Sequence, residues 1–358
     1  MNTNLLSLQE RTVFALRELY SRFGYDRYIM SKFEPYDLYA GNKDFLISDN
    51  VITFTDTNGQ LMALKPDVTL SIVKNTRDAD SLQKLYYNEN VYRAPKGGNG
   101  FREMMQVGLE CLGNVDTYCI SEVLYLAQKS LDSISNNYLL SVSDLGLLSA
   151  LLDNMGLTSL QKAQALRCIG EKNIHELLQL CDGWDVAEKD QQILRRLISI
   201  SGRAAQVLPE LKQLLTGTVE DSVLIRFFDV MEALAKLPAG ENLNIDFSVV
   251  DDIHYYTGFV FKGFVSGIPG SVLSGGEYNR LMQKMHRRSS AIGFAVYLDM
   301  LQQLEEPMDA PDTDILLLSG DADPASILAK VEELSREGRV LVSKVKPANI
   351  RCNRIETM

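Results

Sequence analysis

The segment DDIHYYTGFVF, residues 251–261, gathers several groups that can bind a ligand or transfer protons. Two aspartates, a histidine and the adjacent pair Tyr255 and Tyr256 precede a glycine and an apolar run that is typical of a strand. Carboxylates, phenols and an imidazole supply hydrogen-bond donors and acceptors within a short length of chain. The segment is therefore a candidate catalytic or binding site for a small polar ligand.

A second polar set lies on the expected strand FREMMQVGLE, residues 101–110. Side chains alternate between the two faces of a strand, so Gln106, Gly108 and Glu110 share one face, while the other face is apolar and belongs in the core. The glycine leaves a floor on which a small polar ligand could lie close to the backbone. An ordinary solvated sheet face explains the same spacing, and the residues alone leave both interpretations open.

The stretch KPDVT, residues 65–69, places Asp67 and Thr69 two positions apart, which is the same side of an extended chain. In the alternative interpretation, Pro66 ends a strand and Asp67 caps the helix that follows. The sequence is compatible both with ligand binding and with helix capping here.

Several common chemistries find no support in the sequence. The glycine-rich loop APKGGNGF joins two expected strands and lacks the Lys-Ser/Thr ending of a phosphate-binding loop. No G-x-G-x-x-G follows a strand, so dinucleotide binding is not predicted. The five cysteines form no C-x-x-C pair, and the chain has three histidines. We therefore expect reduced thiols, no metal ion and no cofactor.

The charge and polarity of the chain indicate its surroundings. A net charge of −11 disfavours non-specific binding to nucleic acid, because an acidic protein repels phosphates. No apolar run approaches the roughly 18 residues that a membrane span needs, and the start MNTNLLSLQERTVF lacks the pattern of a secretory signal. We expect a cytoplasmic protein with neither a nucleic acid nor a membrane as partner.

The elements that would position the polar residues begin with a helix after Ser7 and a hairpin around Asn58-Gly59. A second hairpin has residues 82–94 and 101–113 as its arms. Helices are predicted over residues 117–136 and 144–155.

An all-helical insertion without a convincing strand is predicted at about residues 156–238, after which strand character returns. The fold class is thus α+β, with a mainly antiparallel sheet flanked by helices over residues 1–305. A Pro- and Asp-rich joint then leads into a short C-terminal segment, residues 306–358, whose pattern is strand, helix, strand.

Taken in order, six segments resemble the catalytic core of histidyl-tRNA synthetase, a class II aminoacyl-tRNA synthetase. They are GYDRYIMSKFE (first motif), LKPDVT, VYRAPKGGNGFREMMQVGLECLG (second motif), DDIHYYTGFVF, LSGGEYNRLM and AIGFAVYLDML (third motif). Six motifs in the right order make the resemblance specific, and they cover roughly residues 7–305. The resemblance implies the class II synthetase fold for this region.

The resemblance also implies a histidine pocket whose positions are filled by suitable residues. They are Asp67, Thr69, Arg93, Gln106, Glu110, Tyr255 and Tyr256. Carboxylates and an amide oxygen can hold the ammonium group of a free amino acid, and acidic or phenolic groups can bond both imidazole nitrogens. Asp67 is one methylene shorter than the glutamate typical of the synthetases.

The residues that activate the amino acid in the synthetases are changed in this chain. Arg93 remains but is followed by Ala94-Pro95, and Met300 stands where an arginine ends the third motif. Asp251 and Glu277 replace two further arginines. An anion in place of a cation beside a phosphate turns attraction into repulsion, about 4 kcal/mol each way at a separation of ~4 Å. The resemblance therefore implies that adenylate formation is lost.

A histidine pocket without activation chemistry or an anticodon-binding domain resembles the family of ATP phosphoribosyltransferase regulatory subunits. In that family the synthetase-like chain assembles with a short catalytic subunit that starts histidine biosynthesis, and histidine is the feedback inhibitor. The resemblance implies a non-catalytic, allosteric subunit that binds histidine and dimerises through its first motif within a hetero-octamer.

Some residues depart from the family pattern. Ser31 replaces a proline of the first motif, and His254 replaces an aspartate without an evident chemical gain.

The alternative function is a divergent ligase that activates histidine or another amino acid for an acceptor other than tRNA.

Overall fold

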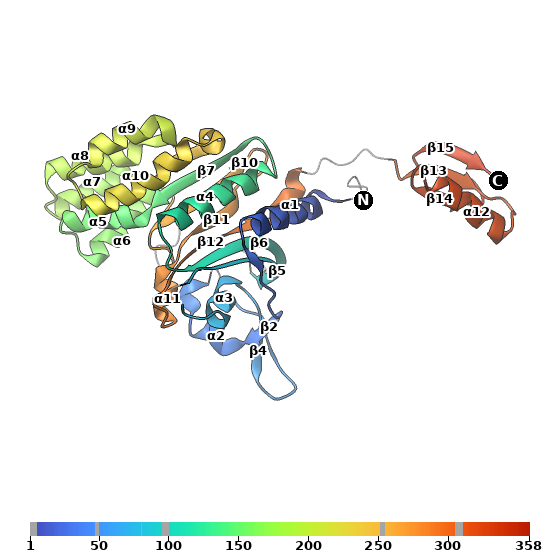
Figure 1. Cartoon of the computed structure of the whole chain (residues 1–358), viewed down its shortest axis with the longest axis horizontal. Coiled ribbons are helices and arrows are strands. Elements are labelled where there is room, and N and C mark those ends of the chain that lie inside the picture. The colour runs from blue at the N-terminus through green and yellow to red at the C-terminus, as the bar shows by residue number, and fades with distance from the viewer. Residues whose placement is uncertain (1–5, 47–49, 80, 95–99, 251–254, 305–310) are drawn as a thin grey trace. The chain divides into compact units, whose positions relative to one another are not determined.

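A computed structural model describes residues 6–46, 50–79, 81–94, 100–250, 255–304 and 311–358 (Figure 1). The chain divides into two compact units, Met1–Leu304 and Glu305–Met358. All the residues that the sequence predicts for a histidine pocket belong to the first unit.

A nine-stranded sheet forms the centre of the first unit (Figure 1). Its strands, in spatial order, are β1 (Asp26–Arg27), β5 (Gln83–Arg93), β6 (Arg102–Gly113), β12 (Ser290–Tyr297), β11 (Ser271–Glu277), β10 (Phe259–Val265), β7 (Tyr138–Asp144), β9 (Leu243–Asp246) and β8 (Ser201–Arg203). Every pairing from β5 across to β7 is antiparallel, whereas β1 joins β5 and β9 joins β7 in parallel. The prediction of a mainly antiparallel sheet is confirmed.

Both predicted hairpins are present in the first unit. The long one is β5 and β6, which pair from Gln83 opposite Leu112 to Arg93 opposite Arg102. The short one consists of β3 (Thr53–Thr55) and β4 (Leu61–Leu64), which form a separate sheet with β2 (Phe33–Pro35). Gly59 in its turn has a φ of 78°, a left-handed conformation that glycine adopts without steric cost.

Alternate residues of the long hairpin belong to two different hydrophobic cores, so the sheet is covered on both faces. Tyr86 and Cys111 lie in a large core with residues of α1 (Leu8–Arg22) and α4 (Thr117–Asp132). Tyr87 and Leu112 lie in a smaller core with residues of α3 (Thr69–Asn75) and α11 (Asn279–Lys284). Ser7 caps α1 as predicted, in a capping box with Glu10.

The remaining helical segments of the smaller core and of the third motif are short. They are α2 (Tyr36–Ala40), the 3-10 helix η2 (Lys43–Phe45) and the 3-10 helix η4 (Leu298–Leu304), which follows β12 directly.

The helical insertion is present and lies at one end of the sheet (Figure 1). It follows α5 (Leu145–Asn154) and consists of α6 (Ser159–Gly170), α7 (Ile174–Gly183), α8 (Glu188–Ser199), α9 (Ala204–Leu215) and α10 (Asp221–Ala235), before the 3-10 helix η3 (Pro238–Asn242). The prediction that it contains no strand was wrong, because β8 lies between α8 and α9 and pairs with β9. β8 has three residues without an apolar pattern, so only its tertiary pairing makes it a strand.

Four further strands were not predicted from the sequence: the short strands β1 and β2, and the longer strands β7 and β15 (Cys352–Thr357). β7 lies between two strongly helical segments, and its residues are buried nearly throughout, which removes the alternation that identifies a half-buried strand. β15 belongs to the second unit, where it pairs in parallel with β13 (Thr313–Leu318). Its sequence CNRIET is largely polar and exposed, so it carries little strand signal.

The second unit otherwise has the predicted strand, helix and strand. These are β13, α12 (Pro324–Leu334) and β14 (Val340–Ser343), with β13 and β14 parallel. Ile315, Leu317 and Leu334 form its small hydrophobic core.

Within the described ranges, no helix is both long and apolar enough to cross a membrane. The same ranges contain no cluster of histidine, cysteine, aspartate or glutamate that could hold a metal ion. All five cysteines are free thiols in this structure.

Candidate functional site

A cavity of about 480 Å³ lies over the central strands of the large sheet. All seven residues that the sequence predicts for the pocket line it: Asp67, Thr69, Arg93, Gln106, Glu110, Tyr255 and Tyr256. They come from the start of α3, from β5 and β6, and from the segment before β10. The fold therefore gathers residues from four distant parts of the chain around one cavity.

Glu110 lies at the centre of the polar network in this cavity. Its carboxylate accepts hydrogen bonds from Thr69 Oγ1 at 2.7 Å and from the Tyr278 hydroxyl at 2.7 Å. Burial raises the pKa of Glu110 to about 8, although both hydroxyl groups oppose the rise. The carboxyl group is thus poised to lose a proton when a cation comes near.

Asp67 takes both of the roles that the sequence left open. Its Oδ1 accepts a hydrogen bond from the Leu70 N–H at 2.9 Å, as a residue at the start of a helix does, and the side chain also lines the cavity. Burial raises the pKa of Asp67, while the Leu70 N–H and the positive charge of Arg93 oppose this rise. Helix capping and a place in the cavity are therefore compatible.

The aromatic wall of the cavity is built around Tyr255. Its ring packs edge-on against Tyr256 and Phe45, with centroids at 4.8 and 5.9 Å, and lies 5.9 Å from the Tyr278 ring. Burial raises the pKa of Tyr255 well above its ordinary value, so its phenol stays a neutral hydrogen-bond donor. This wall combines apolar contact with hydroxyl groups that can bind a polar ligand.

Gly108 does not provide the ligand floor that the sequence suggested. A Cβ atom there would lie 2.4 Å from the Tyr87 hydroxyl and 2.3 Å from the Phe294 carbonyl oxygen. The space above the glycine is therefore occupied by the Tyr87 side chain from the neighbouring strand, and Tyr87 itself lines the cavity. The glycine makes room for a wall residue and not for the ligand directly.

Sequence reasoning missed several residues of this site, among them three that shape the surroundings of Gly108 and Glu110. Tyr87 and Tyr278 line the cavity, and Gly293 allows Glu110 to approach the neighbouring strand, because a Cβ there would lie 1.8 Å from Glu110 Oε2. The tyrosine in GGEYN and the glycine in AIGFAV were both visible in the sequence, but strand pairing decides which side chains they face.

The cavity extends beyond the acidic residues along β10, β11 and β12. Lys262, Ser274 and Tyr297 line this end, and the two hydroxyl groups of Ser274 and Tyr297 lie 2.5 Å apart. This end offers polar groups that could receive a second part of a ligand.

Three residues stand where the synthetases have arginines for activation, and the structure describes two of them. Glu277 and Met300 do not line the cavity; Glu277 forms an ion pair with Arg226, and Met300 packs against the large core. Asp251, which replaces a synthetase arginine, and His254, to which the sequence gave no role, lie outside the described residues.

The chemistry of the cavity favours a ligand with a basic group. The buried carboxylate of Glu110 and the half-buried one of Asp67 both line the cavity, so an ammonium or imidazolium group placed between them would be stabilised. Arg93, which is itself buried, can bind a ligand carboxylate. The cavity has the groups needed to hold a zwitterion that carries an additional basic side chain.

The profile of the histidyl-tRNA synthetase family matches residues 6–301. The chain therefore belongs to the histidyl-tRNA synthetase family, and its fold is that of the class II aminoacyl-tRNA synthetases. Two of its curated relatives carry different names. The ATP phosphoribosyltransferase regulatory subunit of Clostridium botulinum is 26% identical over 345 residues, which are 94% of this chain and 80% of the relative. The histidine–tRNA ligase of Methanocaldococcus jannaschii is 25% identical over 340 residues, 93% and 78% of the two chains.

Solved structures resemble the chain over most of its length. An ATP phosphoribosyltransferase regulatory subunit/histidyl-tRNA synthetase from Bacillus halodurans has a TM-score of 0.77 at 22% identity, covering 98% of this chain and 93% of that one. A chain of the ATP phosphoribosyl transferase (HisG:HisZ) complex from Thermotoga maritima has a TM-score of 0.63 at 19% identity, covering 83% and 98%. Within its family, the chain thus resembles regulatory subunits of ATP phosphoribosyltransferase, as its motifs indicate.

Proposed function

We propose that the chain is a regulatory subunit of ATP phosphoribosyltransferase that assembles with a short catalytic subunit and binds free histidine in the cavity around Glu110. The resemblance to regulatory subunits in sequence, and to a chain of the Thermotoga maritima complex in fold, supports the assembly. The observation that carries the choice of ligand is the buried carboxylate of Glu110, bonded only by hydroxyl groups and facing a cavity with Asp67 and Arg93.

Histidine matches these groups in its chemistry. Its ammonium group suits the carboxylates, its carboxylate suits Arg93, and the two imidazole nitrogens can bond to Glu110 and to the phenol of Tyr255. In this proposal Thr69, Gln106 and Tyr256 complete the pocket, and Asp67 helps to hold the ammonium group.

The same proposal includes the loss of amino-acid activation. Met300 and Glu277 carry no positive charge for a triphosphate, and the carboxylate of Glu277 is already engaged by Arg226. Without cations at these positions the charge that develops on a phosphate would not be stabilised. The subunit acts by binding and not by catalysis.

Control by histidine requires two states of the assembly that bind it with different affinity. We propose that the chain dimerises through its first-motif region within a hetero-octamer, and that histidine favours the state with lower phosphoribosyltransferase activity. The expected setting is the cytoplasm, without a nucleic acid or membrane partner.

Reconstitution tests the assembly. The purified chain is mixed with a short catalytic subunit from the same source, and size-exclusion chromatography with light scattering is followed by an assay of phosphoribosyl transfer. We expect a single larger species and an activity that the catalytic subunit lacks alone. Separate elution with no gain in activity would contradict the proposal.

A second candidate, a divergent ligase, is favoured by the retained Arg93 in the cavity and by the similarity to a histidine–tRNA ligase. Exchange of pyrophosphate into ATP in the presence of histidine distinguishes the two functions. The regulatory function predicts no exchange by the purified chain, and clear exchange would replace it by the ligase.

A further inference from the structure

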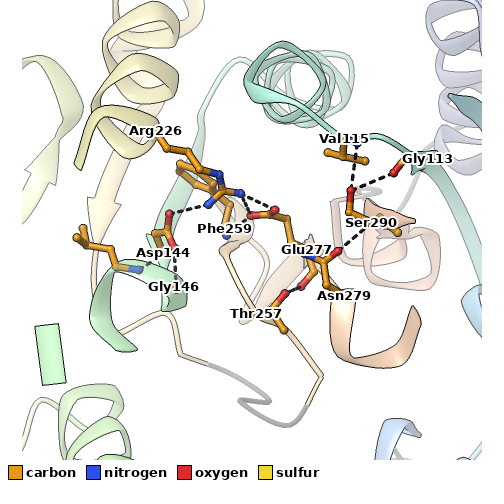
Figure 2. Close-up of polar contacts among 12 residues, drawn as sticks. Gly113, Val115, Asp144, Gly146, Arg226, Thr257, Phe259, Glu277, Asn279 and Ser290 are labelled. Atoms are coloured by element: carbon orange, nitrogen blue, oxygen red, sulfur yellow. Dashed lines mark hydrogen bonds and ion pairs between the residues drawn. The ribbon is translucent and has the colours of Figure 1, made fainter. Parts of the chain in front are cut away.

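Arg226, whose side chain is partly exposed, joins the helical insertion to the sheet by pairing with two buried carboxylates (Figure 2). The guanidinium, which α10 carries, lies 2.5 and 2.6 Å from the two carboxylate oxygens of Glu277 on β11. It also lies 3.6 Å from Asp144 at the end of β7, and 5.3 Å from the centroid of the Phe259 ring. Both carboxylates are almost completely buried, so the arginine is the cation that makes their burial tolerable.

Glu277 in turn holds the chain segment that follows the pocket tyrosines. Its Oε2 accepts a hydrogen bond from the Phe259 N–H at 2.7 Å, and its backbone oxygen accepts one from the Thr257 N–H at 2.9 Å (Figure 2). Gly258 lies between these two contacts, and a Cβ there would come within 2.0 Å of Oε2. Glu277 therefore holds residues 257–259, directly after Tyr256, through its backbone oxygen at Thr257 and its carboxylate at Phe259.

The residue before Glu277 contacts the aromatic wall as well. A Cβ at Gly276 would lie 2.7 Å from Tyr256 Cδ1, so the tyrosine ring packs on the backbone of β11 at this point. Tyr256 supports Tyr255, whose ring is 4.8 Å away. A displacement of the end of β11 would thus be transmitted to both tyrosines.

The insertion is held in the same place by a second contact. Phe227, the neighbour of Arg226 on α10, stacks on Phe259 with centroids 5.9 Å apart and planes within 9°. Asp144, the other carboxylate on the arginine, caps α5 by accepting from the Gly146 and Leu147 N–H groups at 2.7 and 3.1 Å. Three segments, α10, the start of α5 and the end of β11, thus meet at one guanidinium.

We infer that Arg226 is a positioning residue for the ligand cavity: through Glu277 it fixes the segment that carries Tyr255 and Tyr256, so the docking of the helical insertion on the sheet sets the affinity of the cavity for histidine. This inference rests on the proposed histidine pocket. It identifies the insertion as a place where a contact outside the cavity, such as one with another subunit, can change ligand affinity.

The test measures histidine affinity by calorimetry and stability by urea unfolding for the wild-type chain, Arg226→Gln and Arg226→Lys. Lys172→Gln is the matched control, because the ion pair of Lys172 with Asp246, at 2.9 Å, also links the insertion to the sheet, while neither residue lines the cavity. We expect Arg226→Gln to weaken histidine binding about tenfold, which is within the usual range for coupling through an intermediate residue. Arg226→Lys should restore part of the loss, and Lys172→Gln should stay within about twofold.

A double-mutant cycle separates positioning from general destabilisation. In the Tyr255→Phe background, Arg226→Gln should weaken binding by less than about threefold, because the group that it positions is already absent. Equal losses in both backgrounds, or equal affinity of Arg226→Gln and the wild type, would overturn the inference while leaving the histidine pocket in place. A wild-type chain that binds no histidine would overturn the pocket itself and the inference with it.

Discussion

Glu277 and Asp144 beneath the helical insertion can be compared with Glu110 and Asp67 in the cavity, because all four carboxylates lie in the same unit and all but the half-buried Asp67 are buried. The first two share the guanidinium of Arg226. The cavity pair is bonded by hydroxyl groups and a backbone N–H, and neither forms an ion pair with any lysine or arginine that the structure describes. In the first cluster an arginine forms ion pairs with both carboxylates, whereas in the cavity Arg93 acts on Asp67 through its charge without forming an ion pair.

This difference separates a structural role from a binding role. A paired buried carboxylate holds neighbouring segments together, and removing its cation leaves an unpaired charge that destabilises the fold. A buried carboxylate with only neutral donors keeps a raised pKa and gains stability when a cationic ligand arrives. In the function that we propose, the ligand supplies the missing positive charge in the cavity, while the insertion cluster needs no ligand.

The largest expected effect is on ligand affinity when the charge of Glu110 is removed. Glu110→Gln keeps the shape of the side chain but cannot form a charge-assisted bond, so histidine affinity should fall about 100-fold in calorimetry. Glu34→Gln is the control, because Glu34 is a buried glutamate that accepts a 2.7 Å bond from Ser71 and does not line the cavity. Equal affinity in the wild type and Glu110→Gln would remove the distinction between the two clusters.

The next effect concerns stability and the paired cluster. Arg226→Gln should lower the free energy of unfolding by about 2 kcal/mol, less than for a fully buried pair because the arginine side chain is partly exposed. Lys172→Gln breaks a more exposed pair and should cost less than about 1 kcal/mol. Urea unfolding followed by circular dichroism measures both. A similar cost for the two variants would mean that burial does not distinguish the ion pairs.

A smaller effect is the pH dependence of the ligand-free chain. The pKa of Glu110 is raised to about 8, so the folded state holds a proton that the unfolded state releases, and this contribution to stability is lost as pH rises toward 8. Burial also raises the pKa of Asp144, to about 6, so its own change lies mostly below pH 6. Between about pH 6 and 8 the wild type should lose about 2 kcal/mol that Glu110→Gln retains. Parallel stability curves for the two proteins would contradict the raised pKa.

The smallest effect tests the aromatic wall. Tyr255→Phe removes one hydroxyl group and leaves the ring packing, so histidine affinity should fall about fivefold with little change in unfolding. Phe45→Leu is a useful comparison, since it alters the ring contact with Tyr255 without removing a hydrogen-bond donor. If Tyr255→Phe binds histidine as well as the wild type does, the phenol has no part in recognition.

Much of the site could be predicted from the sequence because its motifs occur in order along the chain. The alternation along β6 placed Gln106 and Glu110 on one face, and the structure finds both in the cavity. The role of Gly108 could not be predicted, because it depends on which residue of the neighbouring strand lies opposite, namely Tyr87.

Tertiary contacts bring Arg226 to the insertion cluster and Tyr278 to Glu110 in the cavity. Arg226 is one of several charged residues on α10, and nothing in the local pattern of that helix shows that it meets Glu277. Tyr278 follows a strand directly, and its bond to Glu110 joins residues far apart in sequence. The same reason explains why β8 and β15 were missed, since their partners and not their composition make them strands.

The most direct test of the account is inhibition of the assembled phosphoribosyltransferase by histidine, measured with wild-type and Glu110→Gln regulatory chains and the same catalytic subunit. The account predicts full activity in both assemblies without histidine, and a concentration for half-inhibition about 100-fold higher with Glu110→Gln. Identical inhibition curves would show that histidine acts elsewhere in the assembly, and would contradict the assignment of the Glu110 cavity as the regulatory site.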